Sequence, residues 1–443
     1  MKIKLFGTDG IRSLSSDKIF NNLSLNKLSK AILKKKKSLK ILVGRDTRES
    51  SKKIENNFIK ALARNGAKIF KVGILSTPAI AYLTKKLNCN LGIVISASHN
   101  PYQFNGIKFF DRNGDKLTQL HENRIEKEFF KLVKIRNEYQ KGDGKIQIVK
   151  NPFKLYKKKF TKILIKSNFP NKLKIVFDCA NGSSYKVIKH IFSKININSI
   201  YIKDKPNGKN INYKCGSLHP ETLTNEVKKK SADFGISFDG DGDRIICCDQ
   251  NGKIIDGDKV LACLTEYFLD KSKSKSTSVV GTLMSNRGLE QFINKIGLKF
   301  YRSNIGDKFV YELMKKKKSF LGGEQSGHII LKEFGSSGDG ALIALYLIKI
   351  ISEYNKKTSK IFNLYKSHFQ IQKNIKLKDS NLKKNKKIIR LLSFYNNKII
   401  NNIRILIRFS GTEHVIRLLV EGEKYSRIKI LANNLHYKIK NIV

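Results

Sequence analysis

Short apolar runs alternate with stretches of helical pattern in three rounds along this chain. The runs are apolar on both faces, which is typical of mostly parallel sheets covered by helices in α/β units. The alternation therefore predicts three similar α/β domains with parallel or mixed sheets. The runs lie at residues 40–46, 67–73 and 91–98, then at 174–182, 198–203 and 234–240, and finally at 278–285, 298–303 and 319–324.

The C-terminal part of the chain has a different pattern. Residues 402–410 and 414–422 are typical of an antiparallel strand pair, and a helix is expected from about residue 425. At 443 residues the chain is too long for one ordinary core. We expect four domains around one central cleft: three α/β domains at 1–150, 151–250 and 251–365, and a smaller α+β domain at 366–443.

The composition is strongly basic, with 88 Lys and Arg against 36 Asp and Glu and a formal net charge of +52. A nucleic-acid groove concentrates basic and aromatic groups on one element, whereas here the lysine runs are scattered and tryptophan is absent. We therefore expect a solvated basic surface that binds polyanions weakly, with no specific nucleic-acid partner.

The chain shows no sign of a membrane or secretory protein. No apolar run approaches the roughly 20 residues that span a bilayer, and the N-terminus lacks the apolar region of a signal peptide. The six cysteines form no C-x-x-C pair, so reduced, buried residues are expected. These features predict a cytoplasmic protein without a membrane partner.

Polar clusters stand at the ends of the expected strands, where open α/β sheets bind their ligands. One cluster occurs in each round of the alternation, and a fourth lies in the C-terminal part. This arrangement suggests a single cleft shared by all four domains. The clusters are "SASHNP" (96–101), "DGDGDR" (239–244), "GEQSGH" (323–328) and "RFSGTEHVIR" (408–417).

The acidic cluster alternates Asp239, Asp241 and Asp243 with single glycines. Carboxylates this close repel one another unless a cation lies among them, and carboxylate oxygens are ligands that Mg²⁺ prefers. An EF-hand is excluded, because its sixth and twelfth positions require Gly and Glu and are here Arg244 and Gln250. A solvated acidic turn stays the alternative to a metal site.

The serine cluster places Ser98 and His99 in one loop before Lys108. An Asn-Pro turn capped by serine is the structural alternative. The G-x-S-x-G pattern of a hydrolase is missing. A serine that carries a phosphoryl group fits better, and its charge of about −2 would add to that of the aspartates. A divalent cation would offset part of that charge, and Arg12, Lys108 and Arg244 could offset the rest.

The two remaining clusters offer groups for polar ligands. The glycine-rich turn suits recognition of vicinal hydroxyls, and its histidine could move protons, although a simple loop is an equally good interpretation. Its candidates are Glu324, Ser326 and His328. In the last cluster two arginines flank hydroxyl and backbone donors, which indicates a phosphate clamp or else a β-hairpin with incidental arginines. Its candidates are Arg408, Ser410, Gly411, Thr412 and Arg417.

Together, and in this order, the four clusters resemble the α-D-phosphohexomutase family over the full length of the chain. Within the family, residues 210–223 and 281–290 are most similar to the bacterial phosphoglucosamine mutase branch. Other shared motifs are "FGTDGIR" at 6–12, "GRDTR" at 44–48, "TP" at 77–78, "NGIK" at 105–108 and "SGTE" at 410–413. The chain departs from the family at Ser13, Lys308, Phe409 and His414, and the last two leave the clamp less basic and its turn less rigid.

The resemblance implies that Ser98 is a phosphoserine. One Mg²⁺ per subunit would be held by the three aspartates and an oxygen of the Ser98 phosphate. Arg12, Lys108 and His328 would transfer protons or stabilise charge, and Arg244 would contact the substrate. Glu324 and Ser326 would hold sugar hydroxyls. The non-reacting phosphate would be held by Arg408, Ser410, Gly411, Thr412 and Arg417.

The reaction implied by the resemblance interconverts glucosamine 6-phosphate and glucosamine 1-phosphate through a bisphosphate intermediate. A sugar 1,6-bisphosphate would act as activator, and the product would feed the synthesis of UDP-N-acetylglucosamine and cell-wall precursors. Phosphomannomutase or phosphoglucomutase activity is the alternative within the same family. A monomer or homodimer is expected.

A haloacid-dehalogenase-type phosphotransferase with Asp239 as nucleophile is a second kind of enzyme to consider. That family has Thr or Val at the fifth position of D-x-D-x-T/V, where this chain has Asp243. The pattern therefore disfavours it. A nucleic-acid-binding protein is suggested only by the net charge.

Overall fold

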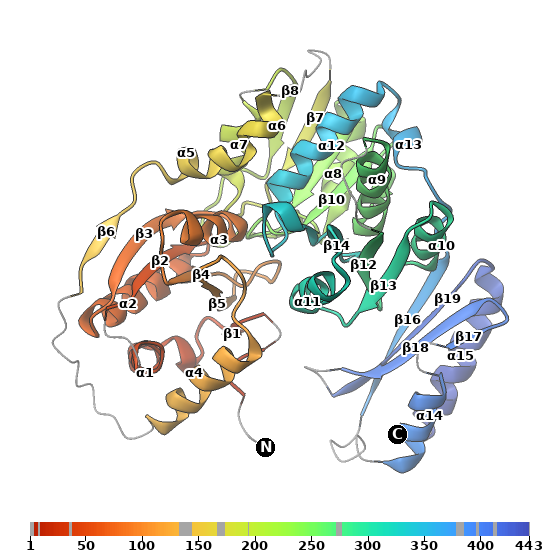
Figure 1. Cartoon of the computed structure of the whole chain (residues 1–443). Helices are drawn as coiled ribbons and strands as arrows, with labels where there is room; N and C mark the ends of the chain where they lie inside the picture. Colours follow the sequence, from red (N-terminus) through yellow and green to blue (C-terminus); the bar gives the residue numbers. More distant parts are fainter. Residues whose placement is uncertain are drawn as a thin grey trace.

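The computed structural model describes residues 4–7, 9–34, 38–132, 144–165, 173–193, 195–271, 277–377, 385–395, 398–410 and 414–442. Its strands form four sheets that follow one another along the chain. In Figure 1 the four corresponding domains trace an arc, with the first domain at the left and the fourth at the lower right. The expected fold class, three α/β domains followed by a smaller α+β domain, is confirmed. The domain boundaries near residues 150, 250 and 365 stay predictions.

The first domain has a six-stranded sheet in the order β1-β5-β4-β2-β3-β6. Strands β4, β2, β3 and β6 are parallel, and β5 is antiparallel to its neighbours β1 and β4. Ile41 and Val43 pack into one core and Leu42 into another, so both faces of β2 are buried. The strands are β1 Ile11–Leu14, β2 Lys40–Arg45, β3 Lys68–Ile74, β4 Leu91–Ile95, β5 Phe104–Asp111 and β6 Ile146–Ile148. The helices are η1 Lys18–Phe20, α1 Asn22–Leu33, α2 Glu49–Arg64, α3 Thr77–Lys86 and α4 Gln119–Lys131.

The second domain has a five-stranded sheet in the order β11-β10-β9-β7-β8. Strands β8, β7 and β9 are parallel, and β10 returns antiparallel to β9. The turn between β9 and β10 is therefore at the carboxyl end of a buried parallel strand. The strands are β7 Lys174–Asp178, β8 Asn198–Ile202, β9 Phe234–Phe238, β10 Ile245–Asp249 and β11 Ile254–Ile255. The helices are α5 Pro152–Lys157, η2 Lys158–Phe160, α6 Thr161–Ile165, α7 Tyr185–Phe192 and α8 Pro220–Lys229.

The third domain has a four-stranded sheet in the order β13-β12-β14-β15. Its helix α12 is apolar on nearly all sides and buried from Gly340 to Ile351, because it packs against both α9 and β10. The second and third domains therefore share one core. The strands are β12 Ser278–Thr282, β13 Lys299–Ser303, β14 Leu321–Gly323 and β15 Ile329–Leu331. The helices are α9 Gly257–Asp270, α10 Arg287–Lys295, α11 Asp307–Lys317, η3 Lys332–Phe334, α12 Gly340–Tyr354 and α13 Thr358–Ile361.

The fourth domain has an antiparallel sheet in the order β16-β19-β18-β17 and a core of its own. The expected strand pair is β18 with β19, and the expected helix begins at Tyr425, so both predictions are confirmed. The strands are β16 Phe369–Lys376, β17 Lys398–Ile400, β18 Ile403–Phe409 and β19 Val415–Gly422. The helices are α14 Lys386–Tyr395 and α15 Tyr425–Lys440.

Two general expectations can be compared with the described residues. All six cysteines are buried and free, as the sequence predicted. Among the helices within the described ranges, none combines the length and the apolar character needed to cross a bilayer.

Candidate active site

The serine loop (residues 96–101) and the acidic loop (residues 239–244) meet between the first and second domains. Ser98 follows β4 and Asp239 follows β9, so both lie at carboxyl ends of parallel strands. Ser98 Oγ donates a hydrogen bond to Asp239 Oδ2 over 2.6 Å, and both side chains are buried. The structure thus brings together two clusters that lie in different domains.

The backbone of the serine loop is held from both domains. Ser98 has a positive φ of 54°, which a side-chain-bearing residue adopts only when its surroundings enforce it. The buried guanidinium of Arg48 donates to the carbonyl oxygens of Ser98 (2.9 Å), Asn100 (2.8 Å) and Pro101 (2.6 Å). From the second domain, Asn212 Nδ2 donates to Ser98 O (2.9 Å) and Asn100 O (3.1 Å). These five hydrogen bonds fix the direction in which Ser98 points.

The three aspartates form a compact acidic group. One carboxylate oxygen of each lies within 4.8 Å of the others, and all three residues are buried. Burial and the charges of Asp243 and Asp241 raise the pKa of Asp239 well above its ordinary value. Among the described residues, Asp241 Oδ1 and Asp243 Oδ1 have no hydrogen-bond partner. Buried carboxylate oxygens without donors fit a hard divalent cation such as Mg²⁺.

The acidic loop approaches its neighbours too closely for any side chain at its two glycines. A Cβ on Gly240 would lie 2.6 Å from Ser98 O, and one on Gly242 would lie 1.9 Å from Ser184 Oγ. Gly242 also has a positive φ of 73°. The alternation of Asp with Gly therefore has a steric reason in addition to an electrostatic one.

Lys108 on β5 reaches the acidic group from the first domain. Its Nζ lies 2.8 Å from Asp241 Oδ2, 3.2 Å from Asp243 Oδ2 and 3.0 Å from Asp9 Oδ2. Burial alone would lower the pKa of Lys108, but the three carboxylates raise it well above its ordinary value. Lys108 is therefore held as a cation.

Two arginines complete the positive side of the site. Arg12 on β1 forms an ion pair with Asp9, and Arg244 follows the last aspartate. Their Nε donors are buried and have no hydrogen-bond partner among the described residues. Burial, with the charges of Arg244 and Arg12, lowers the pKa of His99 to about 3. These arginines leave donors available for an anionic ligand.

His328 lies between two carboxylates of different domains. Its Nε2 is 3.1 Å from Asp307 Oδ2, and its Nδ1 is 3.6 Å from Asp243 Oδ1. Burial would lower the pKa of His328, but Asp307 and Asp243 raise it to about 10. The Gly338 N–H also lies 2.8 Å from Nε2 and can donate only to the neutral ring. Two carboxylates outweigh one amide, so the protonated ring is favoured.

The glycine-rich loop (residues 323–328) joins β14 to β15 in the third domain. Ser326 Oγ donates to Glu324 Oε2 over 3.1 Å, and Gly306 N–H donates to Glu324 Oε1 over 2.7 Å. Glu324 therefore holds the start of α11 while its second oxygen stays beside a hydroxyl.

Arg408 and Arg417 form a pair of like charges in the fourth domain. Their Cα atoms are directly opposite in the register of β18 and β19. Burial and the charge of Arg417 lower the pKa of Arg408. Ser410 N–H donates to Val415 O over 2.9 Å and closes the turn between the strands. Gly411 and Thr412 lie outside the described residues.

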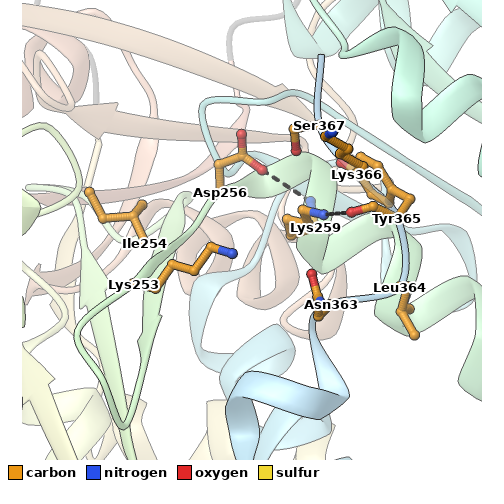
Figure 2. A pocket seen from close by; sticks show the side chains of 9 residues that line it. All are labelled: Lys253, Ile254, Asp256, Lys259, Asn363, Leu364, Tyr365, Lys366 and Ser367. Carbon is orange, nitrogen blue, oxygen red and sulfur yellow. Dashed lines mark hydrogen bonds between the residues drawn. The ribbon is translucent and has the colours of Figure 1, made fainter. Parts of the chain in front are cut away.

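A recess of about 840 Å³ (Figure 2) borders the glycine-rich loop, because its lining residue Asp256 accepts a hydrogen bond from Gln325 Nε2 over 3.2 Å. It is bordered by β11, the first turn of α9 and the linker to the fourth domain, and none of its lining residues was a predicted site residue. Its lining residues are Lys253, Ile254, Asp256, Lys259, Asn363, Leu364, Tyr365, Lys366 and Ser367. The convergence of charged and nucleophilic groups, and not this recess, therefore defines the candidate site.

Sequence reasoning missed several residues that the structure places in the site. Arg48, Asp9 and Thr77 lie inside the motifs "GRDTR", "FGTDGIR" and "TP", so the resemblance contained a signal for them. Thr77 Oγ1 donates to Asp241 Oδ2 over 2.5 Å. Asp307 stands beside Lys308 in "GDKFV" (306–310), a segment that was compared with the family, whereas Lys116 had no comparable signal.

Comparisons with known proteins agree over the whole chain. Three family models match: "Phosphoglucomutase/phosphomannomutase, alpha/beta/alpha domain I" at residues 3–136, domain II at 154–252 and domain III at 256–368. Phosphoglucosamine mutase of Campylobacter curvus is 40% identical over 98% of both chains. The phosphoglucosamine mutases of Campylobacter hominis and Nautilia profundicola are each 42% identical, over 95% and 97% of both chains.

Solved structures show the same fold at low sequence identity. A phosphoglucomutase/phosphomannomutase family protein from Burkholderia thailandensis superposes with a TM-score of 0.83 at 20% identity, over 99% of this chain and 97% of that one. Aspergillus fumigatus N-acetylphosphoglucosamine mutase, solved in complex with GlcNAc-6P and magnesium, gives a TM-score of 0.66 at 16% identity. That match covers 100% of this chain and 96% of the Aspergillus chain.

Proposed function

The chain belongs to the phosphoglucomutase/phosphomannomutase family of α-D-phosphohexomutases, and from that premise we propose that it interconverts glucosamine 6-phosphate and glucosamine 1-phosphate. The reaction is an isomerisation, and the relatives at 40–42% identity carry the name phosphoglucosamine mutase. We expect the enzyme to act in the cytoplasm, as a monomer or homodimer, where its product would feed UDP-N-acetylglucosamine synthesis.

The contact between Ser98 and Asp239 is the observation that carries this proposal. A buried serine hydroxyl at 2.6 Å from a carboxylate of an acidic triad has no evident structural purpose, because four hydrogen bonds to the carbonyls of Ser98 and Asn100 already hold its loop. As a phosphoserine it would place a dianion against a group of three carboxylates that could share a cation with it.

Asp239, Asp241 and Asp243 would hold Mg²⁺ together with an oxygen of the Ser98 phosphate. The donor set fits, since two buried carboxylate oxygens, Asp241 Oδ1 and Asp243 Oδ1, accept no hydrogen bond among the described residues. When bound, the ion would supply positive charge beside the phosphoryl oxygens.

The chemical step exchanges one P–O bond for another. The bond between phosphorus and Ser98 Oγ breaks as a bond forms to a hydroxyl oxygen of the sugar phosphate, and the net proton transfer runs from that hydroxyl to Ser98 Oγ. The reverse step at the other end of the sugar restores the phosphoserine. The fixed backbone of Ser98 keeps Oγ in line with the transferred group.

The basic residues of this site favour charge stabilisation. Lys108 is held as a cation by three carboxylates, and Arg12 and Arg244 offer buried Nε donors that make no hydrogen bond among the described residues. His328 is held as a cation as well. In this state Lys108 and His328 can donate protons and offset the charge of the transferred group, but neither is ready to accept a proton.

The fourth domain supplies the distant end of the site. Arg408 and Arg417 would hold the phosphate that does not react, with Ser410, Gly411 and Thr412 as further donors. Glu324 and Ser326 would contact sugar hydroxyls. Such a clamp has to accept the phosphate from either end of the sugar, because the bisphosphate intermediate turns round between the two transfers.

A coupled assay tests the proposal. The purified protein is given glucosamine 6-phosphate, Mg²⁺ and a trace of sugar bisphosphate, beside parallel reactions with glucose 1-phosphate and mannose 1-phosphate. The largest kcat/KM is expected for the glucosamine phosphate. A larger value for glucose or mannose phosphate would favour the phosphoglucomutase or phosphomannomutase alternative, and no turnover of any of the three would contradict a mutase function.

A further inference from the structure

Six side chains of alternating charge form a closed ring at the junction of the first three domains. In order they are Asp9, Lys116, Asp307, His328, Asp243 and Lys108. The distances between charged atoms are 2.5 Å for Asp9–Lys116, 3.1 Å for Asp307–His328, 3.6 Å for His328–Asp243, 3.2 Å for Asp243–Lys108 and 3.0 Å for Lys108–Asp9. The ring closes through an ion pair between Lys116 Nζ and Asp307 Oδ2.

Half of this ring has no role in the reaction as described so far. His328, Asp243 and Lys108 were given roles in the reaction, whereas Asp9, Lys116 and Asp307 were not. Lys116 lies beyond β5 and pairs with Phe110 through an isolated β-bridge, which fixes its backbone in the first domain. Asp307 is the first residue of α11 in the third domain. The Lys116–Asp307 pair therefore joins two domains.

The surroundings of Lys116 make its position well defined. Its side chain is 13% exposed and that of Asp307 is 9% exposed. A buried ammonium with two carboxylates is costly to displace, because each carboxylate would be left without its counter-charge. Asp307 Oδ2 touches Lys116 Nζ and His328 Nε2 with the same atom, so the place of the lysine sets the place of the imidazole partner.

We propose that Lys116 and Asp307 are positioning residues. Where the first and third domains meet, Lys116 holds the Asp307 carboxylate against His328. Asp307 in turn orients the His328 imidazole toward the reacting phosphoryl group. This inference rests on the proposed mutase function. It assigns the pair a role in the rate of transfer, in addition to any contribution to the contact between domains.

A neighbouring ion pair provides a matched control. Lys308 follows Asp307 directly, and its Nζ lies 2.8 Å from Glu122 Oε2 on α4. The side chains of Lys308 and Glu122 are 11% and 8% exposed, so this pair crosses the same domain boundary at similar burial. Its described contacts do not include His328. A role limited to holding the domains together would affect both pairs alike.

The experiment compares Lys116→Met with Lys308→Met in the full-length enzyme. Methionine keeps the length of lysine and removes its charge. For Lys116→Met we expect kcat to fall about tenfold to a hundredfold, with KM within about threefold and the phosphoserine content of Ser98 unchanged. For Lys308→Met we expect kcat within about twofold of the wild type. Equal losses of kcat in the two variants, or no loss in either, would overturn the inference.

Asp307→Asn gives an independent test and decides the matter if Lys116→Met fails to fold. It should reproduce the loss of kcat, and an unchanged kcat would overturn the inference. The double variant Lys116→Met/Asp307→Asn should be about as slow as either single variant, because one break already opens the ring. If the loss of kcat in the double variant were the product of the two single losses, the residues would have independent roles and the inference would be wrong.

A readout that needs no turnover separates this inference from the proposed function. The ¹⁵N shifts of the His328 ring nitrogens, assigned with a His328→Gln variant, should change in Lys116→Met and stay constant in Lys308→Met. Constant shifts in both variants would overturn the positioning role. If the wild type does not convert glucosamine phosphates, the proposed function fails while the NMR comparison still tests the positioning.

Discussion

Ser98 and Asp239 are 141 positions apart in the chain, yet a hydrogen bond of 2.6 Å joins Ser98 Oγ to Asp239 Oδ2. The serine belongs to the first domain and the aspartate to the second, so their contact depends on how the two domains pack. Asp241 adds a second link across this boundary, because its backbone oxygen accepts from Thr77 N–H over 2.9 Å. The candidate nucleophile and the candidate metal ligands are thus positioned as one unit.

Replacing Asp241 by Asn should nearly abolish turnover while leaving the fold intact. Asparagine keeps the size and one oxygen ligand but removes the charge that would hold Mg²⁺ and that pairs with Lys108. Losing several kcal/mol of transition-state stabilisation corresponds to a rate loss on the order of a thousandfold. Mutase rate and Mg²⁺ binding by calorimetry check this. Near-normal activity that still requires magnesium would contradict the metal site and would indicate that the acidic loop is a simple solvated turn.

Ser98→Ala should be as inactive as Asp241→Asn but should still bind the sugar phosphate. The substitution removes the atom that would carry the phosphoryl group, whereas Arg408 and Arg417 stay in place in the fourth domain. Acid-stable phosphoserine, measured by mass spectrometry, should be present in the wild type and absent from the variant. An acid-labile acyl phosphate that persists in Ser98→Ala would favour an aspartate nucleophile instead.

The sequence predicted the parts of the site that are local in the chain. Ser98 and the aspartates each follow a buried apolar run, and the register of β18 and β19 puts Arg408 opposite Arg417, as a hairpin of these two strands would. Such predictions succeed because strand ends and hairpin partners follow from periodicity and spacing. The role of each of these residues stays a prediction.

The contacts that join domains could not be predicted in the same way. Lys116 pairs with Asp9 and Asp307, which are 107 and 191 positions away, and the chain offers 36 acidic residues as possible partners for this lysine. Charge alone selects no partner among so many candidates, since packing between domains decides which side chains are buried together. Asp307 stands beside Lys308, a position that was compared with the family, but a single aspartate at the start of a helix is common and does not indicate its partner.

Asn212→Gly should slow phosphoryl transfer with only a small loss of stability. Asn212 has a positive φ of 57°, so glycine removes the amide without straining the backbone. The carbonyls of Ser98 and Asn100 keep their hydrogen bonds from Arg48 but lose those from the second domain. Because the serine loop would be positioned less precisely, we expect kcat to fall on the order of tenfold.

The control for this variant is Asn210→Ala. Asn210 lies in the same segment and its amide donates to Lys205 O over 3.0 Å, away from the serine loop. It should lower the melting temperature slightly and leave kcat nearly unchanged. If both variants reduced kcat equally, the effect would come from loosening of the segment, and the specific role of Asn212 would be wrong.

Arg417→Ala should raise KM for the sugar phosphate far more than it changes the phosphorylation of Ser98. Like charges directly opposite on paired strands repel each other, and an anionic ligand beside the Arg408 and Arg417 guanidinium groups would lower that repulsion. A charged hydrogen bond to phosphate contributes about 1.5–3 kcal/mol, which corresponds to a tenfold to hundredfold rise in KM. Arg417→Ala also removes the repulsion between the two like charges, so loss of this charge should not lower the melting temperature of the variant. The exposed Arg427 on α15 gives a control with the same loss of charge, and Arg427→Ala should leave KM unchanged. An unchanged KM in Arg417→Ala, or an equal rise in both variants, would remove the arginine pair from the substrate site.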